Sequence, residues 1–432
     1  MNSIEKGKQG EDFVNKLAYR SLLKYWCYPG PLDEKGDRKE ICDLLIIFDE
    51  TVIIISVKNY TFNKNYSRYF RRTIEKAVKQ IYGAERKLYE SNRDIYIKHP
   101  DRTIELFNPE EAKATYRIIV NLGEGTQFYP FHWLASSKKY ITIFNKDAFV
   151  KIIEELDTIQ DFVNYLEQRE MLFADKSAVI LPGAENEFDF QTAQQFFEHV
   201  GENMHPKHNN QSVLISGTEY DLLAYYLKFE RTFPQSLYSK DYTGHVITID
   251  GFWNEFTQDR RYIQKKELDK VSYLIDELVK REILSNEHEM SIAAAKCLLS
   301  LDRFERRIIA SSLVEFHNSY YNLEGLNFAR RFTQLGDTGI AFGFFPKKME
   351  GNLVNKLLEI AMDSFILYKN YSMDQIILIG ITDDFSQIKI GFINKVAKFS
   401  TKKEEEIRKD VKNLGWFSQH KEFKYSENEY PE

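Results

Sequence analysis

Asp43 and Lys58 are the residues of this chain best suited to do chemistry together. They lie in the run 41–58, where two apolar segments are joined by the polar pair Asp49-Glu50. Such a run predicts a β-hairpin, in which side chains two positions apart share a face. We therefore expect the Asp43 carboxylate and the Lys58 ammonium to meet at the rim of an apolar sheet. Buried charges need a partner, so a metal ion, water or substrate is expected in the gap between them.

Two further features extend this pair into a motif. The triplet Ser56-Val57-Lys58 ends the second apolar segment, and Glu11 opens an early helical run. The order of Glu11, Asp43 and Lys58 resembles the PD-(D/E)xK superfamily of restriction-endonuclease-like nucleases, and among them the Holliday-junction-resolvase and Mrr-like members. In that family an Asp on one strand is followed by a D/E-x-K triplet on the next. The resemblance covers roughly the first third of the chain, given domains of about 100 to 200 residues.

The resemblance implies a metal-dependent hydrolase that cuts phosphodiester bonds in DNA. Asp43 would be the principal ligand of Mg²⁺ or Mn²⁺, helped by the Val57 carbonyl and, through a metal-bound water, by Glu11. Lys58 would orient the attacking water or neutralise the phosphate. The family setting is DNA restriction, repair or defence against foreign DNA, and many such enzymes act as homodimers. A partner in a defence complex is a further expectation, and RNA is left open beside DNA.

Ser56 is where the chain departs from the family, because a serine replaces the second acid of the motif. A hydroxyl is a poor Mg²⁺ ligand beside a carboxylate, although it can hydrogen-bond a metal-bound water. Asp37, in a loop rich in Pro and Gly, could swing in to replace that carboxylate, whereas Glu40 would face the opposite side of a regular strand. Alternatively, catalysis has lapsed, and the fold serves as a nucleic-acid-binding module or a structural partner. Asp43 and Lys58 are also compatible with a structural ion pair.

The segment 58–87 is strongly basic, although the whole chain carries a net charge of −6. It contains nine lysines and arginines against two glutamates. Positive charge next to the candidate site predicts contacts with nucleic-acid phosphates. The residues expected to make them are Arg68, Arg71, Arg72, Lys76, Lys79 and Gln80. Gln80 lies on a predicted helix similar to the glutamine-bearing helix of RecB-like nucleases, but it is equally compatible with a surface or packing role.

Aromatic residues are interleaved with these cations. They are predicted either to stack on unpaired bases or to fill the core behind a solvated helical face. The residues concerned are Tyr60, Tyr66, Tyr69, Phe70 and Tyr82.

The pattern of apolar segments predicts an α/β protein with two or three domains in its 432 residues. We expect a mixed sheet flanked by helices over residues 1–172, a mainly helical middle region over 173–330 and a second α/β region over 331–432. No internal repeat is evident. Two strands are expected within 41–58, and others at 116–120, 140–144, 213–215, 339–345, 375–381 and 388–393. Helices are expected at 5–24, 73–91, 146–156, 162–169, 220–230, 265–281, 292–316 and 353–368, with a capping box from Thr158 to Asp161.

Several other features point away from competing functions. The three cysteines have neither a zinc-binding spacing nor a disulfide framework, which favours a reducing cytoplasm and simple burial. The N-terminus lacks the apolar core of a signal peptide, and the apolar runs are too short to span a bilayer. His199, His205 and His208 fit a polar loop better than a zinc site, because their spacing matches no firm motif. Residues 123–126 lack the lysine of a phosphate-binding loop.

Overall fold

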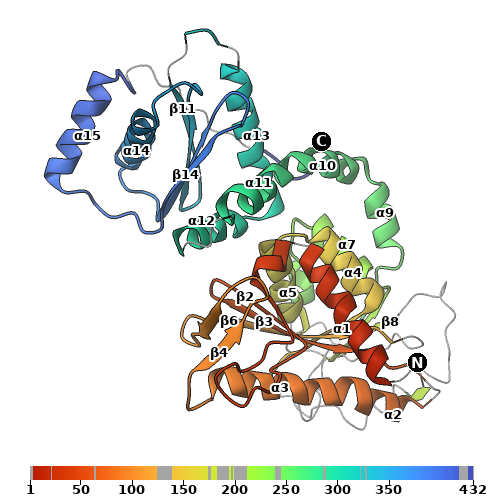
Figure 1. Ribbon diagram of the computed structural model, residues 1–432. Helices are drawn as coiled ribbons and strands as arrows, with labels where there is room; N and C mark the ends of the chain where they lie inside the picture. Colours follow the sequence, from red (N-terminus) through yellow and green to blue (C-terminus); the bar gives the residue numbers. More distant parts are fainter. Residues whose placement is uncertain are drawn as a thin grey trace. The chain divides into compact units, whose positions relative to one another are not determined.

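The computed structural model divides the chain into two compact units, the N-terminal unit Met1–Asp259 and the C-terminal unit Arg260–Glu432 (Figure 1). Both contain helices and sheets with parallel and antiparallel strands, so the prediction of an α/β protein is confirmed. The boundary falls inside the region expected to be mainly helical, whose residues belong to both units. The structure describes residues 3–20, 22–62, 65–123, 139–173, 177–181, 194–195, 198, 212–238, 245–285, 289–321, 323–325, 328–417 and 427–431.

The N-terminal unit is organised around a five-stranded sheet in the order β1-β2-β3-β6-β7. β1, β2 and β3 are antiparallel neighbours, while β3, β6 and β7 are parallel. β3 is buried along almost its whole length, as expected for a central strand covered on both faces. The strands are β1 (Cys27–Pro29), β2 (Leu44–Phe48), β3 (Thr51–Lys58), β6 (Ala114–Asn121) and β7 (Thr142–Asn145).

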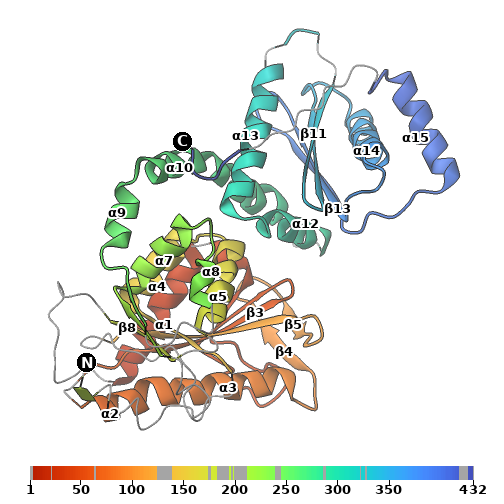
Figure 2. The ribbon, with the colours of Figure 1, turned by 180° about the vertical axis from the view of Figure 1, so that it is seen from behind.

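Helices cover both faces of this sheet (Figures 1 and 2). α3 (Lys76–Tyr89) packs on one face, and α1 (Ser3–Arg20) and α4 (Lys146–Glu155) pack on the other. Gly10 allows α1 to approach the sheet closely, because a Cβ at this position would lie 3.0 Å from a Leu122 methyl group. α1 is thereby held against β3, whose last residue is Lys58.

The basic segment forms one helical stretch that begins earlier than the predicted start at residue 73. It consists of α2 (Tyr66–Phe70), a π-helical turn η2 (Arg71–Glu75) and α3. Asn65 caps its first turn, since the Asn65 side chain accepts a hydrogen bond from the backbone nitrogen of Arg68 at 2.9 Å. π-helical turns are rare and often occur at functional sites.

The aromatic residues of this stretch divide into two groups. Tyr66, Tyr69 and Phe70 are at most 5% exposed, so the expectation that they stack on bases is wrong. They lie on the core-facing side of the helix and fill the core, as the alternative interpretation predicted. Tyr60 and Tyr82 are only partly buried, and the Tyr82 hydroxyl donates to the Lys139 carbonyl at 2.8 Å.

The rest of the N-terminal unit contains a second, parallel sheet in the order β10-β9-β8. The predicted capping box is confirmed, because Thr158 and Asp161 form its hydrogen bonds at α5 (Ile159–Phe173). Thr218 and Asp221 form a second capping box at α7 (Glu219–Lys228). The remaining elements are η1 (Leu22–Trp26), β4 (Ile95–Lys98), β5 (Ile104–Phe107), β8 (Ser177–Leu181), β9 (Ser212–Ser216), α8 (Gln235–Tyr238), β10 (His245–Thr248) and α9 (Phe252–Gln258).

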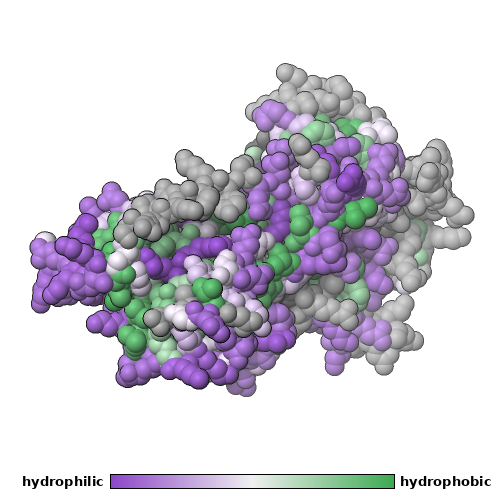
Figure 3. Space-filling view, turned by 90° about the horizontal axis from the view of Figure 1, so that it is seen from above, coloured by the Kyte–Doolittle hydropathy of each residue, from purple (hydrophilic) through white to green (hydrophobic). Residues whose placement is uncertain are grey.

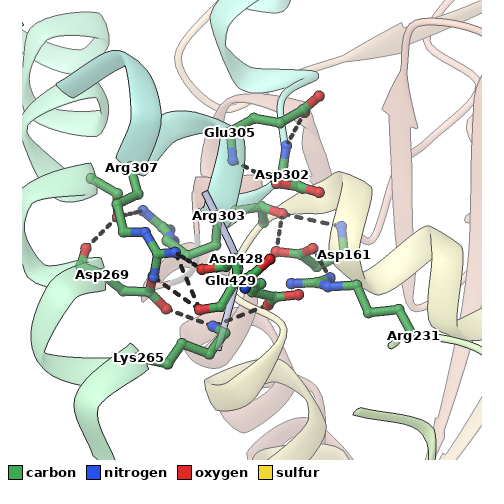
Figure 4. A network of polar contacts seen from close by, with 12 residues as sticks. Asp161, Arg231, Lys265, Asp269, Asp302, Arg303, Glu305, Arg307, Asn428 and Glu429 are labelled. Carbon is green, nitrogen blue, oxygen red and sulfur yellow. Dashed lines mark hydrogen bonds and ion pairs between the residues drawn. The ribbon is translucent and has the colours of Figure 1, made fainter. Parts of the chain in front are cut away.

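The C-terminal unit begins with helices that are tied together by buried ion pairs. Lys265 and Arg307 both bind Asp269, at 2.6 Å and 3.1 Å, and Arg307 also donates to the backbone carbonyls of Asn428 and Glu429 (Figure 4). The chain segment around Glu429 is therefore held against this part of the unit. The elements are α10 (Arg260–Asp269), η4 (Lys270–Ser272), α11 (Tyr273–Leu278), η5 (Val279–Ile283), α12 (Glu289–Leu299) and α13 (Arg303–Tyr320).

Asp302 explains why one predicted helix is two. A single helix was expected over 292–316, but α12 ends at Leu299 and α13 starts at Arg303. Asp302 has extended backbone geometry, and its side chain accepts a hydrogen bond from the backbone nitrogen of Glu305 at 2.8 Å. It is therefore an N-cap that starts a new helix.

The C-terminal sheet has the order β11-β12-β13-β14, with β12 and β13 parallel and the outer pairs antiparallel. Its topology repeats that of the N-terminal unit, which the sequence did not reveal: a helix, an antiparallel hairpin, a crossover helix and a parallel strand. The repeat is α1-β2-β3-α3-β6 in one unit and α13-β11-β12-α14-β13 in the other. The elements are β11 (Ala329–Leu335), β12 (Thr338–Phe344), α14 (Gly351–Tyr368), β13 (Gln375–Ile381), β14 (Ile388–Ile393) and α15 (Thr401–Asn413).

The two hairpins differ where the repeat would place a charged site. Leu44, the first residue of β2, pairs with Ile55, and the polar Ser56 follows. Ala329, the first residue of β11, pairs with Phe344, and the following Phe345 is 1% exposed. The second hairpin therefore ends in the apolar core.

In the part of the chain that the structure describes, none of the helices is both long and apolar enough to cross a membrane. On the face seen in Figure 3, hydrophobic residues form small patches among hydrophilic ones. All three cysteines, Cys27, Cys42 and Cys297, are free and buried. His199, His205, His208 and residues 124–126 lie outside the described residues.

Candidate active site

Asp43 and Lys58 meet at the rim of the five-stranded sheet, as the hairpin pattern predicted. Asp43 comes just before β2, and its Oδ2 accepts hydrogen bonds from the Val57 backbone nitrogen at 2.5 Å and from the Ser56 hydroxyl at 3.0 Å. Lys58 Nζ lies 3.4 Å from the same oxygen. Both side chains are largely buried, with exposed fractions of 7% for Lys58 and 11% for Asp43.

Ser56 sits inside this network rather than beside it. Lys58 Nζ donates to the Ser56 hydroxyl at 2.8 Å, and that hydroxyl donates in turn to Asp43. Lys58 Nζ also donates to the Val57 carbonyl at 2.8 Å. Burial lowers the pKa of Lys58, the charge of Asp43 opposes this shift, and the positive charge of Lys76 adds to it.

Glu11 contributes negative charge from α1. Burial raises the pKa of the Glu11 carboxyl, the charge of Asp43 raises it further, and Lys58 lowers it. The three side chains that the sequence pattern predicted to act together, Glu11, Asp43 and Lys58, are therefore coupled electrostatically. Gly10, the residue before Glu11, allows α1 to pack closely on the sheet beside β3.

Glu40 is an acid near this rim that the sequence interpretation set aside, because on a regular strand it would face the opposite side. The pKa of Glu40 is raised by partial burial and then by the charges of Asp43 and Glu11, so its carboxylate adds negative charge near Asp43 while remaining exposed to solvent. Strand alternation does not apply to it, because Glu40 forms only an isolated bridge with Leu32, and β2 starts later in the chain. An acid closely preceding the motif Asp was the available signal.

Asp37 does not swing into the site in this structure. Its carboxylate pairs with Lys87 at 2.7 Å and accepts a hydrogen bond from the backbone nitrogen of Lys39 at 3.1 Å. These contacts lower the pKa of Asp37. The acid that accompanies Asp43 is thus Glu40 and not Asp37.

The basic helical stretch adjoins the site. Gln80 on α3 is exposed, and its side-chain oxygen lies 3.4 Å from the Ser56 hydroxyl. Lys76 lies close enough for its charge to lower the Lys58 pKa. The remaining cations of the predicted binding face also project into solvent, namely Arg68, Arg71, Arg72 and Lys79.

Asn121 is a further residue of this rim. It ends β6, where it is paired with Lys58 of the parallel strand β3, and it is fully buried. Its side-chain nitrogen donates to the Tyr69 hydroxyl, and its oxygen accepts from the Gly123 backbone nitrogen at 3.1 Å. Asn121 thus ties the sheet rim to α2. A polar residue that ends an apolar strand is the signal that could have found it.

Comparison of the chain with protein-family models, curated proteins and solved structures found no match. The resemblance to PD-(D/E)xK nucleases therefore remains a prediction based on the residues quoted above.

The acidic residues of the site fit a divalent cation only in part. Among the residues that the structure describes, no three His, Cys, Asp or Glu side chains converge closely enough to hold a metal ion. Asp43 Oδ2 is occupied by its three donors, while no hydrogen bond to Asp43 Oδ1 is found in the described part. Asp43 is thus the direct ligand that the arrangement offers, and Glu11 and Glu40 supply negative charge around it. Mg²⁺ commonly keeps several waters in such sites.

Proposed function

We propose that the protein is a metal-dependent nuclease that hydrolyses phosphodiester bonds in DNA, with a role in restriction or defence against foreign DNA in the cytoplasm. The observation that carries the proposal is the hydrogen-bonded cluster of Asp43, Ser56 and Lys58 at the rim of the sheet. Glu11 and Glu40 are coupled to it electrostatically. An acid and a lysine joined in one cluster, with two further acids coupled to them beside a basic helix, match the chemistry of phosphodiester hydrolysis.

Each residue of the cluster has a role in this proposal. Asp43 would hold Mg²⁺ or Mn²⁺ directly, with the Val57 carbonyl as a second oxygen, and Glu11 and Glu40 would supply negative charge around the ion. The bound ion would activate water and offset charge on the phosphate. Lys58 orients the attacking water or pairs with the phosphate, and Ser56 holds the Lys58 ammonium in place.

The exposed face of α2, η2 and α3 holds the nucleic acid. Lys76, Lys79 and Gln80 lie on one side of a helix, at spacings of three and four residues, and they are exposed. Gln80 and Lys76 are also the residues of this face that reach Ser56 and Lys58. A nucleic-acid strand whose phosphate groups bind along this helix would therefore reach the cluster of Asp43, Ser56 and Lys58. RNA would use the same contacts, because phosphate contacts carry no information about the base.

Cleavage of DNA by matched variants tests the proposal. The full-length protein is incubated with linear, circular and single-stranded DNA in Mg²⁺, in Mn²⁺ and in EDTA. We expect metal-dependent cutting that Asp43→Asn and Lys58→Met each reduce by about 10²-fold or more. Asp37→Asn is the control, since Asp37 is held by Lys87 away from the cluster. Cutting that survives both cluster changes would refute the assignment of this site.

A second candidate function is a nucleic-acid-binding module without catalysis. The observation in its favour is that Lys58 Nζ already has three oxygen partners, while the described residues show no group of three converging metal ligands. This alternative predicts DNA retention without cutting. Retention would be weakened by Arg71→Ala, by Arg72→Ala and by added salt.

A further inference from the structure

Arg330 in the C-terminal unit occupies an unusual position for a charged residue. It lies on β11, an edge strand of the four-stranded sheet, between Phe328 and Phe332 on the same face. Its guanidinium stacks on the Trp416 ring, 3.9 Å from the ring centroid, and lies 5.5 Å from that of Phe417.

The Arg330 charge has no acidic partner among the residues that the structure describes. Its Nε is buried and makes no hydrogen bond. Burial lowers the pKa of Arg330 to about 10, with no carboxylate opposing the shift. Arg306 of the same unit shows the contrast, because its buried guanidinium pairs with Asp276 at 2.6 Å. A charge withdrawn from water without a counter-charge is disfavoured, so an external anion would stabilise Arg330.

The surroundings of Arg330 are flat and aromatic. Trp416 stacks on Phe328 with centroids 5.7 Å apart, and Phe417 stacks on Tyr368 with centroids 4.9 Å apart. The Tyr368 side chain remains 38% exposed. A planar guanidinium can bind phosphate oxygens in bidentate fashion, and exposed rings provide stacking surfaces for bases.

We propose that Arg330, Trp416 and Tyr368 form a nucleotide-binding site in the C-terminal unit. The phosphate of the nucleotide pairs with the Arg330 guanidinium, and the base stacks on the exposed aromatic surface. The Lys369 ammonium, 5.7 Å from the Tyr368 ring centroid, adds positive charge beside it. The nucleotide is either free or part of a nucleic-acid strand. The site binds without cutting, because the second hairpin lacks the charged cluster of the first and ends in the buried Phe345.

Thermal unfolding of the full-length protein in EDTA, where metal-dependent cleavage is blocked, tests this site. The probes are inorganic phosphate, AMP, ATP and a short single-stranded oligothymidylate, added to wild type, Arg330→Gln and Arg331→Gln. Arg331 is the matched control, since it is the next residue on the strand and binds the Ser312 carbonyl on the other face. Ligands that bind the folded state raise the Tm as their concentration rises.

We expect AMP, ATP or the oligonucleotide to raise the Tm of wild type and of Arg331→Gln. Arg330→Gln should weaken the apparent affinity about tenfold or more, in line with the loss of charged hydrogen bonds. Free Arg330→Gln should be no less stable than wild type, because it removes a partly buried charge that has no acidic partner among the described residues. A response to AMP or ATP identifies a free nucleotide as ligand, and a response to the oligonucleotide alone identifies a strand.

Three outcomes would overturn the proposal. They are the absence of any Tm shift, a shift that Arg330→Gln leaves unchanged, and a fall in Tm of the free Arg330→Gln protein that marks a structural role. The double variant Lys76→Gln/Lys79→Gln distinguishes this site from binding at the basic helical stretch. It should retain the ligand-induced rise in Tm that depends on Arg330. None of these outcomes depends on whether the Asp43 cluster cleaves DNA.

Discussion

Lys58 Nζ donates a 2.8 Å hydrogen bond to the Ser56 hydroxyl, the group that stands where the motif would have a second acid. The serine therefore takes part in the polar cluster instead of leaving a gap in it. Ser56 is 2% exposed, and its hydroxyl donates a hydrogen bond to the Asp43 carboxylate at 3.0 Å. This relationship makes position 56 the most informative place to alter the site.

Ser56→Ala should destabilise the N-terminal unit, because it removes an acceptor for Lys58 and a donor to Asp43 in a buried place. We expect a loss of about 1–2 kcal/mol in the free energy of unfolding, measured with urea. Ser364→Ala is the control, since that buried hydroxyl donates only to a carbonyl of its own helix. Equal losses in the two variants would contradict a special role for Ser56.

Ser56→Asp should make stability strongly dependent on a divalent cation. Without metal, the new carboxylate lies next to Asp43, and the repulsion between buried like charges lowers the Tm. With Mg²⁺ or Mn²⁺ present, two carboxylates face the ion, and the Tm should recover by more than wild type gains. Thermal unfolding with and without each cation measures this. A variant that metal does not rescue would argue against a cation at this position.

Glu11→Gln and Glu40→Gln should raise the Tm at neutral pH in the absence of divalent cations. The pKa of each carboxyl is raised above its ordinary value of 4.5 by burial and by Asp43. The protonated form is therefore favoured in the folded state. The stability that it contributes is present below about pH 4.5 and is lost as the pH rises through the folded-state pKa. The advantage of the variants should accordingly shrink in acid, and a gain that is the same at every pH would contradict the coupling.

Lys76→Gln and Lys79→Gln should weaken DNA binding in a salt-dependent manner. Each lost phosphate contact is expected to reduce the slope of log affinity against log salt by about 1. Lys98→Gln provides the comparison, because Lys98 is exposed on β4 and does not belong to the basic helical stretch. Fluorescence anisotropy with labelled DNA at several salt concentrations measures the slopes. Equal slopes for all three variants would show that α3 does not contact the phosphates of the DNA.

Asp276→Ala should strongly destabilise the C-terminal unit. Asp276 pairs with Arg303 and Arg306, each at 2.6 Å, and all three side chains are at most 5% exposed. Removing the acid breaks two buried ion pairs at once, at a cost of about 3–5 kcal/mol. Glu267→Ala, which breaks an exposed pair with Lys270, should cost about 0–1 kcal/mol. Urea unfolding followed by circular dichroism compares the two, and similar midpoints would contradict this account.

Local patterns in the sequence were sufficient for the elements that build the site. The apolar segments of β2 and β3 and the polar turn between them indicated a hairpin, which brings Asp43 and Lys58 to one rim. Thr158 marked a helix start, because an N-cap acts within a single turn. The core aromatic residues of α2 were misplaced in one of the two interpretations, since the side of a helix that faces a sheet is decided by packing.

The position of Glu40 and the repeated topology were not predicted from the sequence, for a different reason. Glu40 comes near Asp43 because the chain before β2 is held by a bridge between Leu32 and Glu40 and by contacts with distant residues, such as the ion pair between Asp37 and Lys87. The helix–hairpin–helix–strand order recurs without recognisable sequence similarity, because strand pairing depends on which strands lie side by side.

Asp43 and Lys58 thus show which features of the site follow from the sequence and which depend on the tertiary structure. The sequence by itself determined that an acid and a lysine end neighbouring strands and that a basic helical stretch follows, because strand alternation and helical spacing are local properties. Only the tertiary structure decided that the charge of Asp43 acts on Glu11 and Glu40, that Ser56 bridges Asp43 and Lys58, and that the Arg330 guanidinium stacks on Trp416. These relationships depend on burial and on contacts between distant segments, which arise only when the sheets and helices pack.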